Sequence, residues 1–136
     1  MPERLTFNLD TLGLMASTAA EIVFKIESSL PRVPWLSNSG QKEAFRKIVG
    51  TISDAVEKLD ADEDAKYAVT FWALTVLYAN SKNFRLAVVS VKNWGGVAVS
   101  PAVSLFLHWI GSNSHPNEVL IPVIAARRLG DTHNKS

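Results

Sequence analysis

The sequence predicts an all-α protein, built as a compact bundle or orthogonal array of five to six helices. Apolar residues recur every three or four positions in most segments, as they do on one face of a helix. Prolines, glycines and polar clusters separate these segments. With 136 residues, 47% of them hydrophobic and 20% charged, the chain has the size and composition of one globular domain. We therefore expect a single helical domain over residues 1–129, followed by a polar C-terminal tail over residues 130–136.

The first predicted helix covers residues 9–29 and carries an apolar stripe that begins at Leu9. Asn8 can cap its start, because a side-chain oxygen at this position accepts a hydrogen bond from the first free N–H groups. Two prolines follow the helix and end it, since proline lacks an N–H group and disfavours the α conformation in the preceding residue. The loop after them contains Trp35.

The second predicted helix covers residues 41–59, with Ser39 as its cap. Its first turns carry a small basic face, at the helix end where the dipole favours acidic side chains. We interpret this face as solvated surface, with contact to phosphate or to a carboxylate-rich partner as the alternative. The face consists of Lys42, Arg46 and Lys47.

A third helix is predicted over residues 63–79, because alternating aspartates from Asp60 onward supply carboxylates for its free N–H groups. Their D-x-D-x-D spacing resembles the start of an EF-hand loop. Calcium is nevertheless excluded, because Ala65 stands where the loop needs glycine and Phe71 where it needs glutamate. The helix includes Trp72 and is apolar around its whole circumference, which indicates a central place in the core or one half of an interface.

Residues 84–94 fit two kinds of secondary structure. Their valines favour a strand, whereas the positions of Phe84 and Trp94 fit a helical stripe. We predict a helix because the neighbouring segments are helical. Two glycines then favour its end.

A fifth helix is predicted to open at Ser100, whose hydroxyl can cap it, with proline in the first helical position, and to close at Gly111. A polar loop over residues 112–117 follows. The last segment, residues 118–129, contains Pro122 and is predicted to be a kinked helix, or to be extended as far as the proline and helical afterwards. Gly130 is then expected to stop the helix.

The sequence shows no arrangement typical of a catalytic or metal site. The three histidines are dispersed, and none has a carboxylate or nucleophile at a suitable spacing. The chain has no cysteine, which excludes disulfides and thiolate zinc sites. The common phosphate-binding, dinucleotide-binding, zinc-protease and hydrolase motifs do not occur. We therefore predict a protein that is not an enzyme and has no cofactor.

The leading functional hypothesis is a structural or interaction protein that self-associates or docks on a protein partner. Four tryptophans and a helix that is apolar all round are more large apolar surface than one small core needs to bury. Tryptophan is also enriched at buried interface positions. The predicted interface residues are Trp35, Trp72 and Trp109, together with the tail.

The alternative is a nucleic-acid-binding assembly subunit, such as a helical coat or nucleoprotein-like protein. The net charge is only +1, so such binding requires local basic patches. Cations and aromatics alternate around Phe84 and Trp94, as they do in single-strand binders, although a core position for both aromatics is the simpler interpretation. The residues concerned are Lys42, Arg46, Lys47, Lys82, Arg85 and Lys92.

The N-terminal segment has no uninterrupted apolar core, so it does not have the pattern of a signal peptide. The longest apolar run, residues 68–79, is shorter than the roughly 20 residues that cross a bilayer. We therefore expect a cytoplasmic protein, with attachment to a membrane surface as a further possibility.

Overall fold

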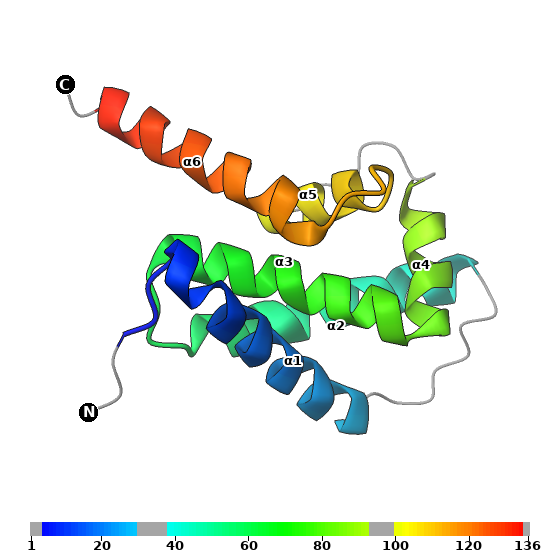
Figure 1. The fold of residues 1–136 in the computed structure, drawn as a ribbon. Helices are drawn as coiled ribbons and strands as arrows, with labels where there is room; N and C mark the ends of the chain where they lie inside the picture. Colours follow the sequence, from blue (N-terminus) through cyan, green and yellow to red (C-terminus); the bar gives the residue numbers. More distant parts are fainter. Residues whose placement is uncertain (1–3, 30–37, 93–99, 135–136) are drawn as a thin grey trace.

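A computed structural model describes residues 4–29, 38–92 and 100–134 (Figure 1). Within these residues the chain forms a short 3-10 helix, six α-helices and no β-strand, so the predicted all-α fold class is confirmed. The elements are η1 (Leu9–Thr11), α1 (Leu12–Ser29), α2 (Asn38–Glu57), α3 (Glu63–Asn80), α4 (Lys82–Lys92), α5 (Pro101–Trp109) and α6 (Pro116–Asn134).

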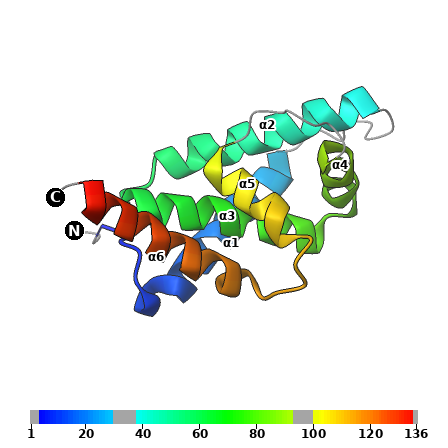
Figure 2. The same ribbon diagram turned by 90° about the horizontal axis from the view of Figure 1, so that it is seen from above.

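The third helix, α3, lies at the centre of the fold. The other five α-helices all contact it, and they surround it in both views of the ribbon (Figures 1 and 2). Its alanines, such as Ala65 and Ala68, are fully buried and let neighbouring helices approach, while Phe71 and Leu74 fill the space between them. Of the two predicted explanations for its apolar circumference, the central place in the core is therefore the observed one.

Aromatic side chains join α3 to the helices on one side of the core. Phe84 of α4 is fully buried and stacks on Phe45 of α2, with ring centroids 5.9 Å apart. The ring centroid of Phe106 in α5 lies 6.0 Å from that of Phe84 and 5.9 Å from that of Tyr78. Full burial of one such ring contributes on the order of 1.5–3 kcal/mol. The prediction of a helix over residues 84–94 is confirmed as far as Lys92; the last two residues lie outside the described part.

The three caps predicted for the first, third and fifth helices are present. Asn8 accepts hydrogen bonds from the N–H groups of Asp10 and Thr11. Asp62 accepts one from Ala65, and the Ser100 hydroxyl accepts one from Val103. Each bond stays within one turn of the chain, which is why the local sequence could predict it.

Two details at the first two helices differ from the prediction. Leu9 belongs to the 3-10 turn before α1 and its side chain is 68% exposed, because the core-facing stripe of α1 instead starts at the fully buried Met15. The second helix begins at Asn38, so Ser39 lies inside it and is not its cap.

The last helix also differs from the prediction. It starts at Pro116, inside the predicted loop, and runs without interruption through Pro122, so the alternative of an extended segment is wrong. It also continues through Gly130, the expected end, as far as Asn134. Burial of Leu120 and Ile124 against the core holds the helix together on either side of the proline.

Candidate functional site

Residues 60–62, just before α3, hold the extended N-terminal segment around Leu5 in place. The N–H of Leu5 donates to the carbonyl of Asp60 at 2.9 Å, and the N–H of Asp62 donates to the carbonyl of Leu5, also at 2.9 Å. The N–H of Phe7 donates to the Asp62 carboxylate at 3.4 Å, and the Arg4 guanidinium lies 3.7 Å from the Asp60 carboxylate. The aspartates that resemble a calcium loop therefore bind another part of the chain.

The next aspartate, Asp64, holds the C-terminal half of α6. Its carboxylate lies 2.9 Å from Nε of Arg128 and 3.6 Å from Nε of Arg127. Arg128 also donates to the carbonyl of Phe7 at 2.7 Å, and its guanidinium lies 5.3 Å from the centre of the Phe7 ring. Arg127 lies 4.6 Å from the centre of the Tyr67 ring. The N-terminal segment and α6 are thus fixed to the same few residues.

An apolar cleft lies between these two anchored segments. Its volume is about 570 Å³. The exposed side chains of Leu9 and Leu129 belong to its wall, at 68% and 67% of their full accessibility. The lining residues are Phe7, Asn8, Leu9, Ile121, Ile124, Ala125, Arg128 and Leu129.

One face of α6 forms a continuous wall of this cleft. Ile121, Ala125 and Leu129 are spaced four residues apart, so they lie on one side of the helix. Leu120 and Ile124 point into the core, while every residue from 125 to 130 is exposed. The C-terminal end of α6 points away from the other helices (Figure 1). The cleft is therefore open along an exposed helix.

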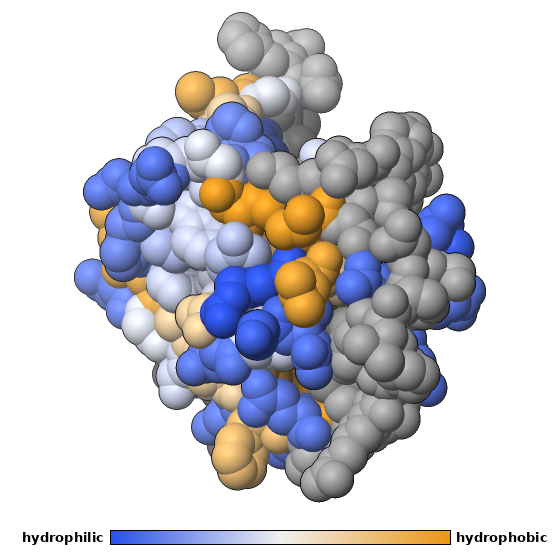
Figure 3. All heavy atoms as spheres, turned by 90° about the vertical axis from the view of Figure 1, so that its right-hand side faces the viewer, coloured by the Kyte–Doolittle hydropathy of each residue, from blue (hydrophilic) through white to orange (hydrophobic). Residues whose placement is uncertain are grey.

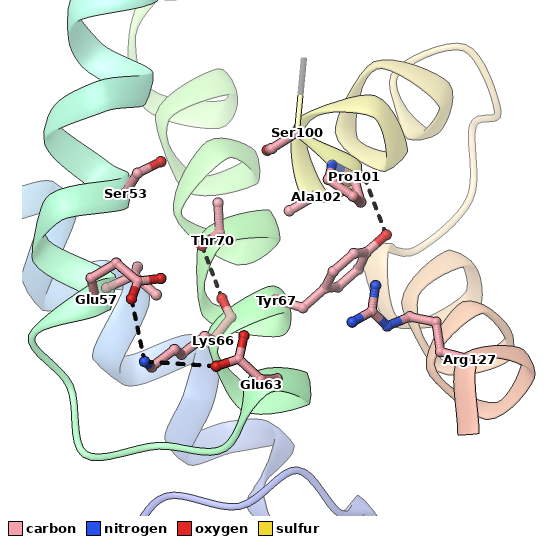
Figure 4. Close-up of a pocket in the computed structure, with 11 residues that line it drawn as sticks. Ser53, Glu57, Glu63, Lys66, Tyr67, Thr70, Ser100, Pro101, Ala102 and Arg127 are labelled. Atoms are coloured by element: carbon pink, nitrogen blue, oxygen red, sulfur yellow. Dashed lines mark hydrogen bonds and ion pairs between the residues drawn. The ribbon is translucent and has the colours of Figure 1, made fainter. Parts of the chain in front are cut away.

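A second, polar cavity of about 270 Å³ lies between α2, α3, α5 and α6 (Figure 4). Its charged groups are paired, two carboxylates with the lysine and Arg127 with Asp64, which lies outside the lining. Lys66 lies 3.5 Å from Glu57 and 3.9 Å from Glu63, and Arg127 is bound to Asp64. Because these pairs already satisfy the charges, the cavity does not have the electrostatics of an anion site or a cation site.

Tyr67 points into this polar cavity, and its hydroxyl donates to the carbonyl of Pro101 at 3.2 Å (Figure 4). Burial raises the pKa of Tyr67 above the ordinary 10.0, and the neighbouring positive charge of Arg127 opposes this shift. A tyrosine with a raised pKa stays protonated near neutral pH and is a poor general base. Tyr67 therefore serves as a link between α3 and α5.

Two of the three predicted interface tryptophans make hydrogen bonds within the chain. The indole N–H of Trp72 donates to the side-chain oxygen of Asn117 at 3.1 Å. The indole N–H of Trp109 donates to the carbonyl of Ser114 at 2.7 Å. Both side chains are half-buried; Trp72 holds the first turn of α6 and Trp109 holds the loop before it. An interface role for them stays a prediction. Trp35 lies outside the described residues.

The predicted basic residues are not all available to a ligand. Arg85 donates to the carbonyls of Tyr78 and Ala79 at 2.9 and 3.2 Å, and so completes the C-terminal end of α3. Phe84 is buried, so its ring cannot stack on a base. Lys42 is half-buried, and the side chain of Lys92 lies outside the description. The three exposed members are Arg46, Lys47 and Lys82.

The end of the molecule that carries α4 mixes hydrophobic and hydrophilic side chains (Figure 3). Leu86 and Val89 of α4 are exposed there, 47% and 56% respectively. Nucleic-acid binding through the predicted basic residues stays a prediction.

The described histidines do not belong to a group of side chains that could hold a metal ion. Among residues 4–29, 38–92 and 100–134, no group of three or more His, Asp or Glu side chains could hold a metal ion. His108 is exposed, and His115 accepts a hydrogen bond from the N–H of Asn117 and contacts the Trp72 ring. His115 therefore belongs to the structure of the loop before α6.

No protein-family model, curated protein or solved structure matches this chain. In the part that the structure describes, no helix combines the length and the apolar character needed to cross a lipid bilayer. The apolar cleft beside α6 is one of the apolar surfaces that the described part of the fold leaves uncovered.

Proposed function

We propose that this protein is a non-enzymatic interaction protein that docks a helix of a protein partner, another copy or a different protein, in the apolar cleft beside α6. The supporting observation is the pair of exposed leucines, Leu9 and Leu129, in the wall of one apolar cleft. Exposed apolar grooves are among the surface features at which proteins bind other molecules.

The shape and chemistry of the cleft fit an amphipathic helix. One wall is a helix face on which Ile121, Ala125 and Leu129 follow one another at intervals of one turn. A partner helix laid against this wall would bury its own apolar stripe, which is a recurring mode of recognition between proteins. Burial of one leucine side chain contributes at most about 1.5–3 kcal/mol, so Leu9 and Leu129 together can drive a moderate affinity.

The anchored walls favour binding without a large rearrangement. Backbone hydrogen bonds of Leu5 with Asp60 and Asp62 fix the N-terminal wall, and the Asp64 carboxylate fixes α6. A cleft whose walls are already ordered loses less conformational entropy when a partner enters. The cleft is therefore better suited to docking than an isolated exposed side chain such as that of Phe24, which is 76% exposed.

Site-specific photocrosslinking tests the proposal. A photoreactive benzophenone side chain replaces Leu9 in the full chain, which is then illuminated in an extract of the cells that produce it, and adducts are identified by mass spectrometry. The matched control carries the same group at Phe24, an apolar residue outside the cleft that is 76% exposed, against 68% for Leu9. We expect a protein adduct at Leu9 that is lost when Ala125→Glu places a charge on the cleft wall.

Three outcomes are informative. An adduct formed at Leu9 and not at Phe24 supports docking in the cleft, whether the captured protein is the same chain or another one. Equal yields at the two positions mean that the capture reflects exposure alone, and they refute the proposal. The absence of any protein adduct at Leu9 refutes it as well.

A further inference from the structure

We infer that residues 125–134, the C-terminal part of α6, form a strap that can detach from the body and unfold locally, and that the Asp64 carboxylate keeps this strap folded and attached. The strap carries Ala125 and Leu129, which belong to the wall of the apolar cleft. Its detachment therefore removes that wall. The contacts of the strap itself support this device, whether or not the cleft docks a partner.

Burial in the core holds α6 only as far as Ile124. Leu120 and Ile124 are buried, whereas every residue from 125 to 130 is exposed. The end of α6 points away from the other helices (Figure 1). A helical segment shorter than about 12–15 residues is marginal in water, because most of the stability of helices in proteins comes from the packing of an apolar face. The strap therefore needs another source of stability.

Gly130 weakens the strap further. Glycine inside a helix lowers the equilibrium constant for helix formation roughly two- to fivefold relative to alanine. The helix nevertheless continues through Gly130, where an added Cβ would meet no atom within 4 Å. Packing therefore does not require glycine at this position. The residue lowers the stability of the strap without improving its fit to the body.

Two arginines attach the strap to a single carboxylate. Of residues 125–130, whose side chains the structure describes, Arg127 and Arg128 make the hydrogen bonds and ion pairs that reach other elements. Nε of Arg128 lies 2.9 Å from the Asp64 carboxylate, and Nε of Arg127 lies 3.6 Å from it. The Asp64 side chain is only 21% exposed, so salt screens these contacts less than contacts between fully exposed charges.

Loss of the Asp64 charge leaves the two adjacent positive charges of the strap without their common partner. The contacts that remain are the hydrogen bond from Arg128 to the carbonyl of Phe7 and the packing of the two guanidiniums on the rings of Phe7 and Tyr67. A short, exposed helix with these contacts alone opens more often. Asp64 therefore controls whether the cleft has one wall or two.

Hydrogen–deuterium exchange of the full chain, read by mass spectrometry, tests this device because it measures local opening of backbone hydrogen bonds. Asp64→Asn should speed the exchange of the strap amides roughly tenfold, since the strap loses a charge-assisted hydrogen bond and an ion pair. Glu63→Gln is the matched control. Glu63 lies in the same first turn of α3, but it is 84% exposed and pairs with Lys66 instead of the strap. Both variants lose an acid that favours the helix dipole, so the difference between them reports the strap.

Two variants within the strap make the test independent of α3. Arg128→Gln should speed the exchange of the strap amides at least as much as Asp64→Asn. Asp64→Asn should then add less in the Arg128→Gln chain than it does alone, because the two side chains act through one contact. Gly130→Ala should slow the exchange roughly two- to fivefold, because it strengthens the helix and leaves the arginines in place.

The pattern of exchange decides the result. Faster exchange that is confined to the strap in Asp64→Asn and Arg128→Gln, with no such change in Glu63→Gln, supports the device. Equal effects of Asp64→Asn and Glu63→Gln overturn it, because the charge at the start of α3 then matters and not the contact. An equal rise along the whole chain overturns it as well, since the strap is then not a separate unit. A strap that already exchanges like an unfolded peptide in the original chain also overturns it.

Photocrosslinking of the Asp64→Asn chain separates the device from the proposed docking function. We expect the benzophenone at Leu9 to capture less of its partner when the strap detaches. If exchange shows that the strap detaches and Leu9 captures no protein in either chain, the docking function is wrong and the strap stands. If capture is the same in both chains although the strap detaches in one, control of the cleft by Asp64 is overturned.

Discussion

Substitution of Asp62 is expected to show what the three alternating aspartates do. In the structure the Asp62 carboxylate accepts a hydrogen bond from the N–H of Ala65 at 2.7 Å and caps α3. Loss of such a cap costs about 1 kcal/mol, within a range of roughly 0.5–2 kcal/mol. The second bond, from the N–H of Phe7, is long at 3.4 Å and adds little. For Asp62→Ala we therefore expect the free energy of unfolding to fall by about 1–2 kcal/mol.

The assay is urea unfolding followed by circular dichroism, with two matched variants. Asp62→Asn keeps an oxygen that can accept the Ala65 hydrogen bond, and its stability should stay within about 0.5 kcal/mol of the original. Asp60→Ala removes a carboxylate that is 73% exposed and lies 3.7 Å from the Arg4 guanidinium. An exposed ion pair of this kind contributes at most about 0.5 kcal/mol to the free energy of unfolding. Addition of calcium should change none of these differences, because the side chains are used for capping and chain contacts.

Three results would contradict this reasoning. If Asp60→Ala destabilises the protein as much as Asp62→Ala, negative charge in the segment matters more than the cap. If Asp62→Asn is as damaging as Asp62→Ala, the carboxylate acts through its charge and not as a hydrogen-bond acceptor. A large stabilisation by calcium that disappears in all the variants would contradict the exclusion of a calcium site.

Three further outcomes are expected from the same structure. Gly50→Ala should raise the free energy of unfolding by roughly 0.5–1 kcal/mol in urea unfolding, because Gly50 is exposed inside α2 and an added Cβ meets no atom within 4 Å. Trp109→Phe should lower it by about 1–2 kcal/mol, because the substitution leaves the carbonyl of Ser114 without its donor. In an ultraviolet pH titration Tyr67 should ionise above the ordinary pH of about 10, and Arg127→Gln should raise its pKa further. Because Tyr67 keeps its proton to higher pH when folded, its contribution to stability is complete below about pH 10 and is lost as the pH rises through the folded pKa.

The parts of the fold that the sequence predicts well depend on short-range interactions. Asn8, Asp62 and Ser100 cap helices through backbone groups two or three residues away, so the neighbouring residues contain the whole signal. Likewise, the apolar circumference of residues 63–79 requires burial on all sides, and the centre of a bundle provides it.

The predicted ends of the last helix are wrong because tertiary contacts override the local preferences of proline and glycine. Pro122 removes one backbone hydrogen bond, but burial of Leu120 and Ile124 on the core side keeps the helix continuous. Gly130 favours a helix end only when its backbone adopts a left-handed conformation, and here it stays helical. Proline and glycine thus predict where a helix can end, and the packing decides whether it does.

The candidate cleft could not be predicted from the sequence, because its walls come from opposite ends of the chain. The hydrogen bond from Arg128 to the carbonyl of Phe7 joins residues 121 positions apart. Helical spacing also cannot distinguish an apolar residue that the core covers from one that it leaves open. For that reason the spacing places Leu9 on the inward stripe of the first helix, although in the structure it lies in the exposed turn before α1.

The aspartates at the start of α3 help to explain why the sequence does not predict the cleft that we propose as the docking site. Each has a plausible local role as a helix-capping or dipole-matching acid, and that role conceals the long-range one. In the structure the backbone of Asp60 and Asp62 also holds Leu5, and the Asp64 carboxylate holds α6, so the two walls of the cleft are tied to one short segment. Neither wall can move away without breaking a contact to that segment. In the proposed docking, a partner helix would therefore meet a cleft that the folding of α3 has already formed, and the stability of the fold and the shape of the docking surface would depend on the same residues.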